Sequence, residues 1–187
     1  MIGRKIAVVT GASSGIGAAT VGALAGAGFH VIAGARRLSR VQEIVEPHGG
    51  QAPPLDVTDG ESVEAFAAAV PRVHLLVNNA GLALGVDPVA TADLSLWERM
   101  YETNVLGILR MTRALLPALI ASGDGHLMNV VSIAGFETYG GGGGYTASKH
   151  AVRALTRTLR LELLGKPVRV TEICPGLAET EFSLVRF

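Results

Sequence analysis

Length and composition predict a folded chain, because 187 residues fit one domain and 49% hydrophobic with 17% charged residues excludes an intrinsically disordered protein. Sixteen basic residues balance sixteen acidic ones, and a formal net charge of +0 gives no reason to expect nucleic acid as a partner. We therefore expect a single domain over residues 1–187.

Cysteine content and the N-terminus bear on the cellular compartment. Cys174 is the only cysteine, so no disulfide can form within the chain. The apolar run near the N-terminus is too short, and meets glycine too early, for a signal peptide. No apolar run reaches the roughly 18 residues that suggest a membrane span. We expect a cytoplasmic protein with no membrane partner.

Strand-like and helix-like segments alternate along the chain. Nearly continuous apolar runs predict strands at 5–10, 30–35, 73–78, 126–132 and 168–174. Longer amphipathic stretches predict helices at 15–27, 38–46, 59–70, 95–121 and 145–164. This repeated βα order predicts an α/β fold of Rossmann type, with a doubly wound parallel sheet between two layers of helices, three layers in all.

Two local patterns refine this prediction. Residues 51–56 give a weaker sixth strand, since their two prolines argue against one and only their place in the alternation favours it. Thr58 with Glu61, and Ser95 with Glu98, have the spacing of capping boxes, which predicts a helix start at each pair.

A glycine-rich turn, TGASSGIG at 10–17, follows the first strand and leads into a helix. Glycines at 11, 15 and 17 permit a tight turn and let the backbone approach a pyrophosphate, which would lie against the helix N-terminus. A glycine-rich turn without a ligand is the alternative. The strand-turn-helix context favours a dinucleotide site.

The second strand ends in two arginines. No carboxylate occurs between Gly17 and Gln42, so the acidic partner of a ribose 2′-hydroxyl is missing, and Arg36 and Arg37 stand in its place. Guanidinium groups suit a 2′-phosphate, which favours NADP over NAD. The alternative is that both arginines are solvated residues at a helix start.

Polar residues at the ends of later strands should meet at the same edge of the sheet. Asp56 and Val57 end the weak strand at 51–56, and Asn79 follows the strand at 73–78. Open α/β sheets bind ligands at this carboxyl edge, so these residues are expected to contact the cofactor. For Asn79, a plain turn residue is the alternative.

Tyr145 and Lys149 lie four residues apart, on one face of a predicted helix. At ~4 Å and an effective dielectric of ~20, an ammonium and a phenolate attract by about 4 kcal/mol, enough to bring the pKa of the phenol toward neutrality. Such a tyrosine can act as a general acid or base. Ser132, at the end of the predicted strand at 126–132, could hydrogen-bond the substrate oxygen.

Three further features stay open at this stage. Asn104 lies within a predicted helix, where a satisfied buried amide is the simpler interpretation. The five glycines at 140–144 are either a flexible loop or a region that leaves room for a ligand. The histidines show no metal-ligand spacing, so we expect no metal.

Together the motifs resemble the short-chain dehydrogenase/reductase family over essentially the whole chain. They are TGASSGIG at 10–17, DVT at 56–58, NNAG at 78–81, Asn104, VVSIAG at 130–135, YTASK at 145–149 and CPG at 174–176. The resemblance implies that Tyr145 is the acid/base, Lys149 lowers its pKa and holds the nicotinamide ribose, Ser132 orients the substrate oxygen and Asn104 holds a water in a proton relay. It implies cofactor contacts from Gly11, Ala12, Ser13, Ser14, Gly15, Ile16, Arg36, Arg37, Asp56, Val57, Asn79, Tyr145, Lys149, Pro175, Gly176 and Thr180.

Two longer segments, 76–85 and 168–187, are similar to the NADP-dependent 3-hydroxy acid dehydrogenases, also called serine or allo-threonine dehydrogenases. This similarity implies hydride transfer between NADP(H) and a small 3-hydroxy acid. An NADPH-dependent ketoreductase for larger carbonyl substrates and a non-catalytic nucleotide-sensing module are the alternatives. The family also implies a homo-oligomer, with a tetramer favoured.

Members of this family usually continue beyond the CPG segment with a further helix and a last strand, whereas this sequence stops at Phe187. We therefore expect a fold without that helix and strand here, and a domain that is incomplete at its C-terminus.

Overall fold

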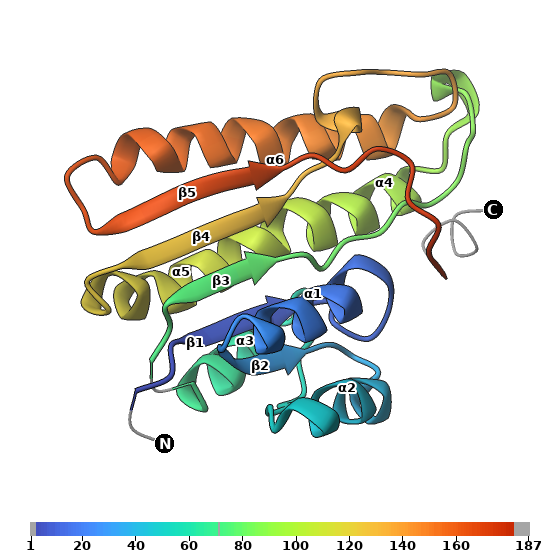
Figure 1. Cartoon of the computed structure of the whole chain (residues 1–187). Coiled ribbons are helices and arrows are strands. Elements are labelled where there is room, and N and C mark those ends of the chain that lie inside the picture. The colour runs from blue at the N-terminus through green and yellow to red at the C-terminus, as the bar shows by residue number, and fades with distance from the viewer. Residues whose placement is uncertain (1–2, 71, 182–187) are drawn as a thin grey trace.

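The computed structural model describes residues 3–70 and 72–181 (Figure 1). Within these residues, five strands form one parallel sheet in the order β2-β1-β3-β4-β5. The strands are β1 (Ile6–Thr10), β2 (His30–Gly34), β3 (Leu75–Asn78), β4 (Gly125–Val130) and β5 (Val168–Ile173). The strand order reverses between β1 and β3, which is where doubly wound sheets bind ligands.

Helices cover both faces of the sheet. On one face lie α1 (Gly15–Gly26) and α2 (Leu38–Val45), and on the other lie α3 (Gly60–Ala68), α5 (Gly107–Ala121) and α6 (Gly143–Glu162). The helix α4 (Leu94–Tyr101) packs against α6. Short 3₁₀ turns occupy Glu46–His48, Val89–Thr91 and Ile133–Gly135. The prediction of a three-layer, doubly wound parallel sheet is confirmed.

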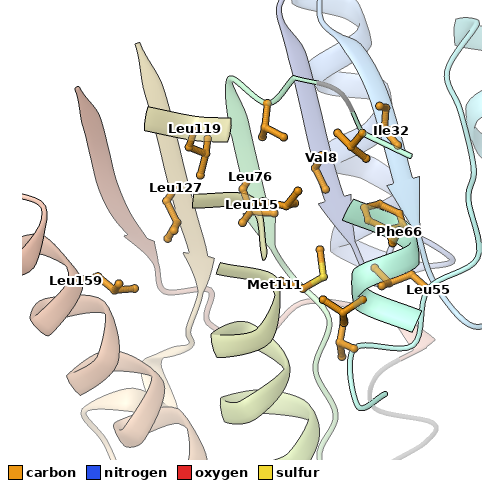
Figure 2. Packing of buried hydrophobic residues seen from close by; sticks show 14 residues of the cluster. Val8, Ile32, Leu55, Phe66, Leu76, Met111, Leu115, Leu119, Leu127 and Leu159 are labelled. Carbon is orange, nitrogen blue, oxygen red and sulfur yellow. The ribbon is translucent and has the colours of Figure 1, made fainter. Parts of the chain in front are cut away.

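The alternation of side chains along the strands divides the core into two layers. Val8, Ile32, Leu76 and Leu127 point to the face covered by α3 and α5, where Phe66, Met111, Leu115 and Leu119 pack on them (Figure 2). The neighbouring residues Val9, Val31, Ala33 and Val77 point to the other face, toward Val21 of α1 and Val41 and Val45 of α2. Strands buried on both faces need continuous apolar sequences, which is why the runs were recognisable.

The predicted strand at 51–56 is wrong. Gln51 makes a single bridge to Ile32, donating to the carbonyl of Val31 at 3.0 Å and accepting from Ala33 at 2.8 Å, and no strand follows. Pro53 and Pro54 have no backbone N–H, so they cannot continue the ladder.

The helix predicted at 95–121 is divided. A π-helical segment, Glu102–Leu106, separates α4 from α5, and the N–H of Gly107 bonds to the carbonyl of Glu102, five residues back. The run Leu94–Ala121 is long and apolar enough to cross a membrane by length and composition alone, with a mean hydropathy of 1.4. Its apolar side chains Met111, Leu115 and Leu119 lie in the core of the protein, which accounts for that composition.

Both predicted capping boxes are displaced. Asp59 caps α3 by accepting from the N–H of Glu61 at 3.0 Å, and Asp93 caps α4 by accepting from Ser95 at 2.8 Å. The hydroxyl of Thr58 instead donates to Asp56. Aspartate at the N-cap supplies a full negative charge to the helix N-terminus, which serine and threonine do not.

Candidate active site

A cavity of about 460 Å³ opens at the carboxyl edge of the sheet, beside the strand-order reversal. Fifteen of the sixteen residues with an expected cofactor contact line this cavity, as does Ser132, and they come from segments far apart in the sequence. The predicted residues in its lining are Gly11, Ser13, Ser14, Gly15, Ile16, Arg36, Arg37, Asp56, Val57, Asn79, Ser132, Tyr145, Lys149, Pro175, Gly176 and Thr180.

One of the sixteen expected cofactor residues lies outside the cavity lining. Ala12 is the exception, because it is fully buried and packs into the core between the sheet and α1. Asn104 does not line the cavity either. Glu181 and Arg99, which belong to none of the sequence motifs, also line the cavity.

The glycines of the turn at 10–17 are required by close packing. Gly11 has a φ of 65°, and a Cβ there would lie 2.7 Å from the Cα of Ala80. A Cβ on Gly17 would overlap the carbonyl oxygen of Gly11. The side chain of Asn79 holds this turn, because its amide donates to the carbonyls of Thr10 at 2.9 Å and Gly11 at 3.1 Å. Asn79 therefore positions the turn from the cavity wall.

Positive charge gathers at one part of the cavity. Arg37 donates to the hydroxyls of Ser13 at 3.1 Å and Ser14 at 2.8 Å, and it pairs with Glu181 at 2.9 Å. Burial raises the pKa of Asp56, but hydrogen bonds from Thr58 and the charge of Arg36 outweigh it, so the pKa is lowered overall.

Tyr145 and Lys149 extend from α6 into the cavity. The Nζ of Lys149 lies 5.8 Å from the centre of the Tyr145 ring and donates to the carbonyl of Val130 at 2.9 Å. Burial lowers the pKa of Lys149 to about 8, and an electrostatic interaction with Cys174 partly opposes this. Ser132 follows β4, and its Oγ accepts from the N–H of Ala134 at 3.1 Å.

Asn104 lies in the π-helical segment and is fully buried. Its amide accepts from the N–H of Leu82 and donates to the carbonyl of Leu82, each at 2.8 Å, and it also donates to the hydroxyl of Ser148 at 2.9 Å. These bonds match the satisfied buried amide considered from the sequence. The Asn104 side chain thus links the loop after β3, where Leu82 lines the cavity, to Ser148 of α6.

The glycine string at 140–144 packs closely against its neighbours over most of its length. A Cβ on Gly143 would lie 2.9 Å from the ring of Trp97, and one on Gly144 would overlap Met100. Gly141 has a φ of 74° and faces the carbonyl of Val86. These glycines let the N-terminus of α6 approach α4, which fixes where Tyr145 stands.

The residues present fit a dinucleotide that carries a 2′-phosphate. The turn at 10–17 has no side chain at the points where a Cβ would clash, and it leads into the N-terminus of α1, which favours a pyrophosphate. Arg36 and Arg37 offer guanidinium groups at the same cavity. Tyr145 and Lys149 line another part of it.

A model of the short chain dehydrogenase family matches residues 5–185. An uncharacterized oxidoreductase of Mycobacterium tuberculosis is 62% identical over 98% of this chain and 73% of its own length. A sulfoacetaldehyde reductase of Chromohalobacter salexigens is 46% identical, over 95% of this chain and 74% of the relative. The chain thus spans about three quarters of the length of these relatives.

Two further comparisons concern NADP. The NADP-dependent 3-hydroxy acid dehydrogenase of Escherichia coli K12 is 42% identical over 97% of this chain and 76% of its own length. A solved structure of serine dehydrogenase in a closed form with NADP⁺ has a TM-score of 0.93 at 42% identity, over 97% of this chain and 76% of that one. The family resemblance read from the motifs is confirmed.

Proposed function

Because this chain belongs to the short-chain dehydrogenase family and is an oxidoreductase that acts on CH–OH groups, we propose that it transfers a hydride between NADP(H) and a small 3-hydroxy acid. One observation carries the proposal. The buried ammonium of Lys149 stands beside the ring of Tyr145, in the same cavity as the glycine turn and the arginine pair.

The side chains of the cavity divide the proposed reaction between them. NADPH, when bound, supplies a hydride to the carbonyl carbon of the substrate. The phenol of Tyr145 donates its proton to the carbonyl oxygen, and in the reverse direction the phenolate accepts a proton from the hydroxyl. The ammonium of Lys149 stabilises the phenolate electrostatically, and Ser132 donates a hydrogen bond to the substrate oxygen.

Residues of the cavity would also hold NADP. The N–H groups of the turn at 10–17 would bind the pyrophosphate, and Arg36 and Arg37 would bind the 2′-phosphate. Asn79 would act by holding the turn, through its bonds to Thr10 and Gly11.

The substrate class rests on the names of the relatives. A 3-hydroxy acid and the alcohol formed from sulfoacetaldehyde both carry a hydroxyl carbon separated from an acid group by one carbon. Both relatives are thus named for small anionic substrates of this shape. A sulfonate is the second candidate, because the sulfoacetaldehyde reductase has the higher identity, 46% against 42%.

The test is a substrate panel with a matched variant. We expect NADP⁺ reduction, followed by NADPH fluorescence, with 3-hydroxypropionate, serine or allo-threonine, and NADPH oxidation with sulfoacetaldehyde if the sulfonate is preferred. Tyr145→Phe removes only the phenol oxygen, so it should still bind NADPH but lose at least about 100-fold in kcat, the usual size of a general acid–base contribution.

Other outcomes would point elsewhere. Activity on bulky ketones but on none of the small acids would favour the ketoreductase. NADPH binding with no turnover of any alcohol or carbonyl would favour the nucleotide-sensing module. A Tyr145→Phe variant as fast as the parent would remove the proposed proton donor.

Assembly and location are also proposals. We propose one catalytic domain over residues 1–187 that forms a homotetramer in the cytoplasm. Exposed apolar side chains support the assembly, among them Leu94, Tyr101 and Leu106, which are 73%, 39% and 39% exposed. The single cysteine, which can form no disulfide within the chain, supports the location.

A further inference from the structure

A carboxylate of the chain itself, Glu181, pairs with two arginines, Arg37 in the cavity lining and Arg40 outside it. Glu181 lies beyond β5, yet its two oxygens accept from the Nη1 atoms of Arg37 at 2.9 Å and Arg40 at 2.7 Å. The remaining nitrogens of Arg37 donate to Ser13 and Ser14. Each of the three guanidinium nitrogens of Arg37 therefore donates one hydrogen bond.

We propose that Glu181 is a cofactor-selecting residue whose carboxylate competes with the 2′-phosphate of NADP for Arg37. The proposal deepens the proposed function and rests on it, since it requires that this cavity bind NADP. Hydrogen bonds from Arg37 and Arg40 lower the pKa of Glu181, so the side chain is ionised at neutral pH.

Charge and exposure make the exchange feasible. The side chains of Arg37, Arg40 and Glu181 are 47%, 49% and 43% exposed, so water screens the ion pairs and they are weak. A phosphate monoester carries a charge of roughly −1.5 to −2 at pH 7, against −1 for a carboxylate, and its oxygens also accept charge-assisted hydrogen bonds from a guanidinium. The neutral 2′-hydroxyl of NAD does not compete for Arg37, so binding of NAD leaves Glu181 in place.

The exchange would also move part of the cavity wall. Thr180 precedes Glu181 directly, and both line the cavity together with Pro175, Gly176 and Ala178. Release from Arg37 would leave Glu181 paired with Arg40 alone, which lies outside the cavity lining, so the end of this segment could shift. Binding of the 2′-phosphate is thereby linked to the position of residues 175–181.

Glu181→Gln tests the proposal, since it removes the charge and keeps the size of the side chain. The probes are adenosine 2′,5′-bisphosphate, which carries the 2′-phosphate, and 5′-AMP, which lacks it, measured by calorimetry on the full chain alongside NADP⁺ and NAD⁺. We expect Glu181→Gln to bind the two 2′-phosphates about two- to five-fold more tightly, as loss of a weak competing ion pair predicts, with 5′-AMP and NAD⁺ unchanged.

Glu179→Gln is the matched control. It removes the same charge two residues away, from an exposed side chain outside the cavity lining, so it should leave the ratio of the two probes unchanged. A merely structural role of Glu181 would change the affinity of both probes together.

The outcomes separate the two proposals. If NADP⁺ binds the parent and Glu181→Gln equally well, the competition is refuted and the proposed function stands. If neither 2′-phosphate ligand binds the parent or the variant, both proposals fall. Equal gains in Glu181→Gln and Glu179→Gln would reduce the effect to general charge and refute the specific role of Glu181.

Discussion

The burial of the charged Lys149 side chain destabilises the folded state. Its side chain belongs to a residue that is 4% exposed, and its Nζ donates to the carbonyl of Val130. Burial of an ammonium disfavours its charged form, which lowers its pKa from 10.5 to about 8. Folding therefore works against a charge that the proposed chemistry needs beside Tyr145.

We predict that Lys149→Met is more stable and inactive. At about 1.4 kcal/mol for each pKa unit, the lowered pKa means that the buried charge destabilises the folded chain by about 3 kcal/mol. The variant also loses the hydrogen bond to Val130, which offsets about 1 kcal/mol of the gain. The free energy of unfolding at pH 7, from urea denaturation, should rise by about 2 kcal/mol, while kcat falls steeply.

The pH dependence gives a second check on Lys149. Between pH 8 and 10.5 the folded chain has lost the proton of Lys149 and the unfolded chain still holds it, so the stability of the parent rises with pH. The advantage of Lys149→Met should shrink over this range. A constant difference, or a less stable variant, would argue against a buried charge at this position.

Some residues of the site could be predicted from the sequence and others could not. Tyr145 and Lys149 were predictable because positions i and i+4 share a helix face. Glu181 was not, because 144 residues separate it from Arg37 and only the fold brings them together. Asn104 was recognised as polar within a helix, but its partner Leu82 comes from a loop whose course the sequence did not predict.

At the scale of elements, strands were predicted better than the boundaries of helices. A buried parallel strand needs a continuous apolar run, and that pattern has few alternatives. Helix starts depend on single side chains, and Asp59 and Asp93 took the capping role from neighbours with an equally suitable spacing. The π-helical segment Glu102–Leu106 has no periodic signal, since it adds one residue to an otherwise regular helix.

The junction of α4 and α6 gives a testable consequence of close packing. We predict that Gly144→Ala destabilises the chain by about 1–3 kcal/mol, because the new methyl group would overlap Met100 and press on Trp97. Turnover should also fall, since Tyr145 is the next residue. Thermal unfolding and kcat would measure the two effects.

Gly140→Ala is the control for Gly144→Ala. A Cβ on Gly140 meets nothing within 4 Å, so this variant should unfold and react like the parent. Equal behaviour of the two variants would mean that the string tolerates side chains throughout and is a loose loop after all.

For the whole molecule, the βα alternation was enough to predict the layers and the parallel sheet. Each crossover returns the chain to the same edge, so the loops that carry the site had to meet there. What surrounds the sheet was not predictable in the same way. Which helix faces stay exposed depends on packing, and Leu94, Tyr101 and Leu106 remain accessible to a partner.

We predict that these exposed side chains are buried in a tetramer. Light scattering coupled to gel filtration should give a tetramer mass for the parent, and Leu106→Asp should lower it, because a charge in an apolar interface is unfavourable. Leu164→Asp, at a residue 75% exposed after α6, is the control and should keep the parent mass. A monomeric parent would refute the assembly.

The π-helical segment Glu102–Leu106 sets the rotation of α4 about the helix axis relative to α5. A regular α-helix rotates by about 100° per residue, so a single-codon deletion here would swing α4 by that angle relative to α5. Met100 and Trp97 would leave Gly144, while the core side chains of α5 could keep their places. The chain with this deletion would still form its central sheet, but the phenol of Tyr145 would be misplaced.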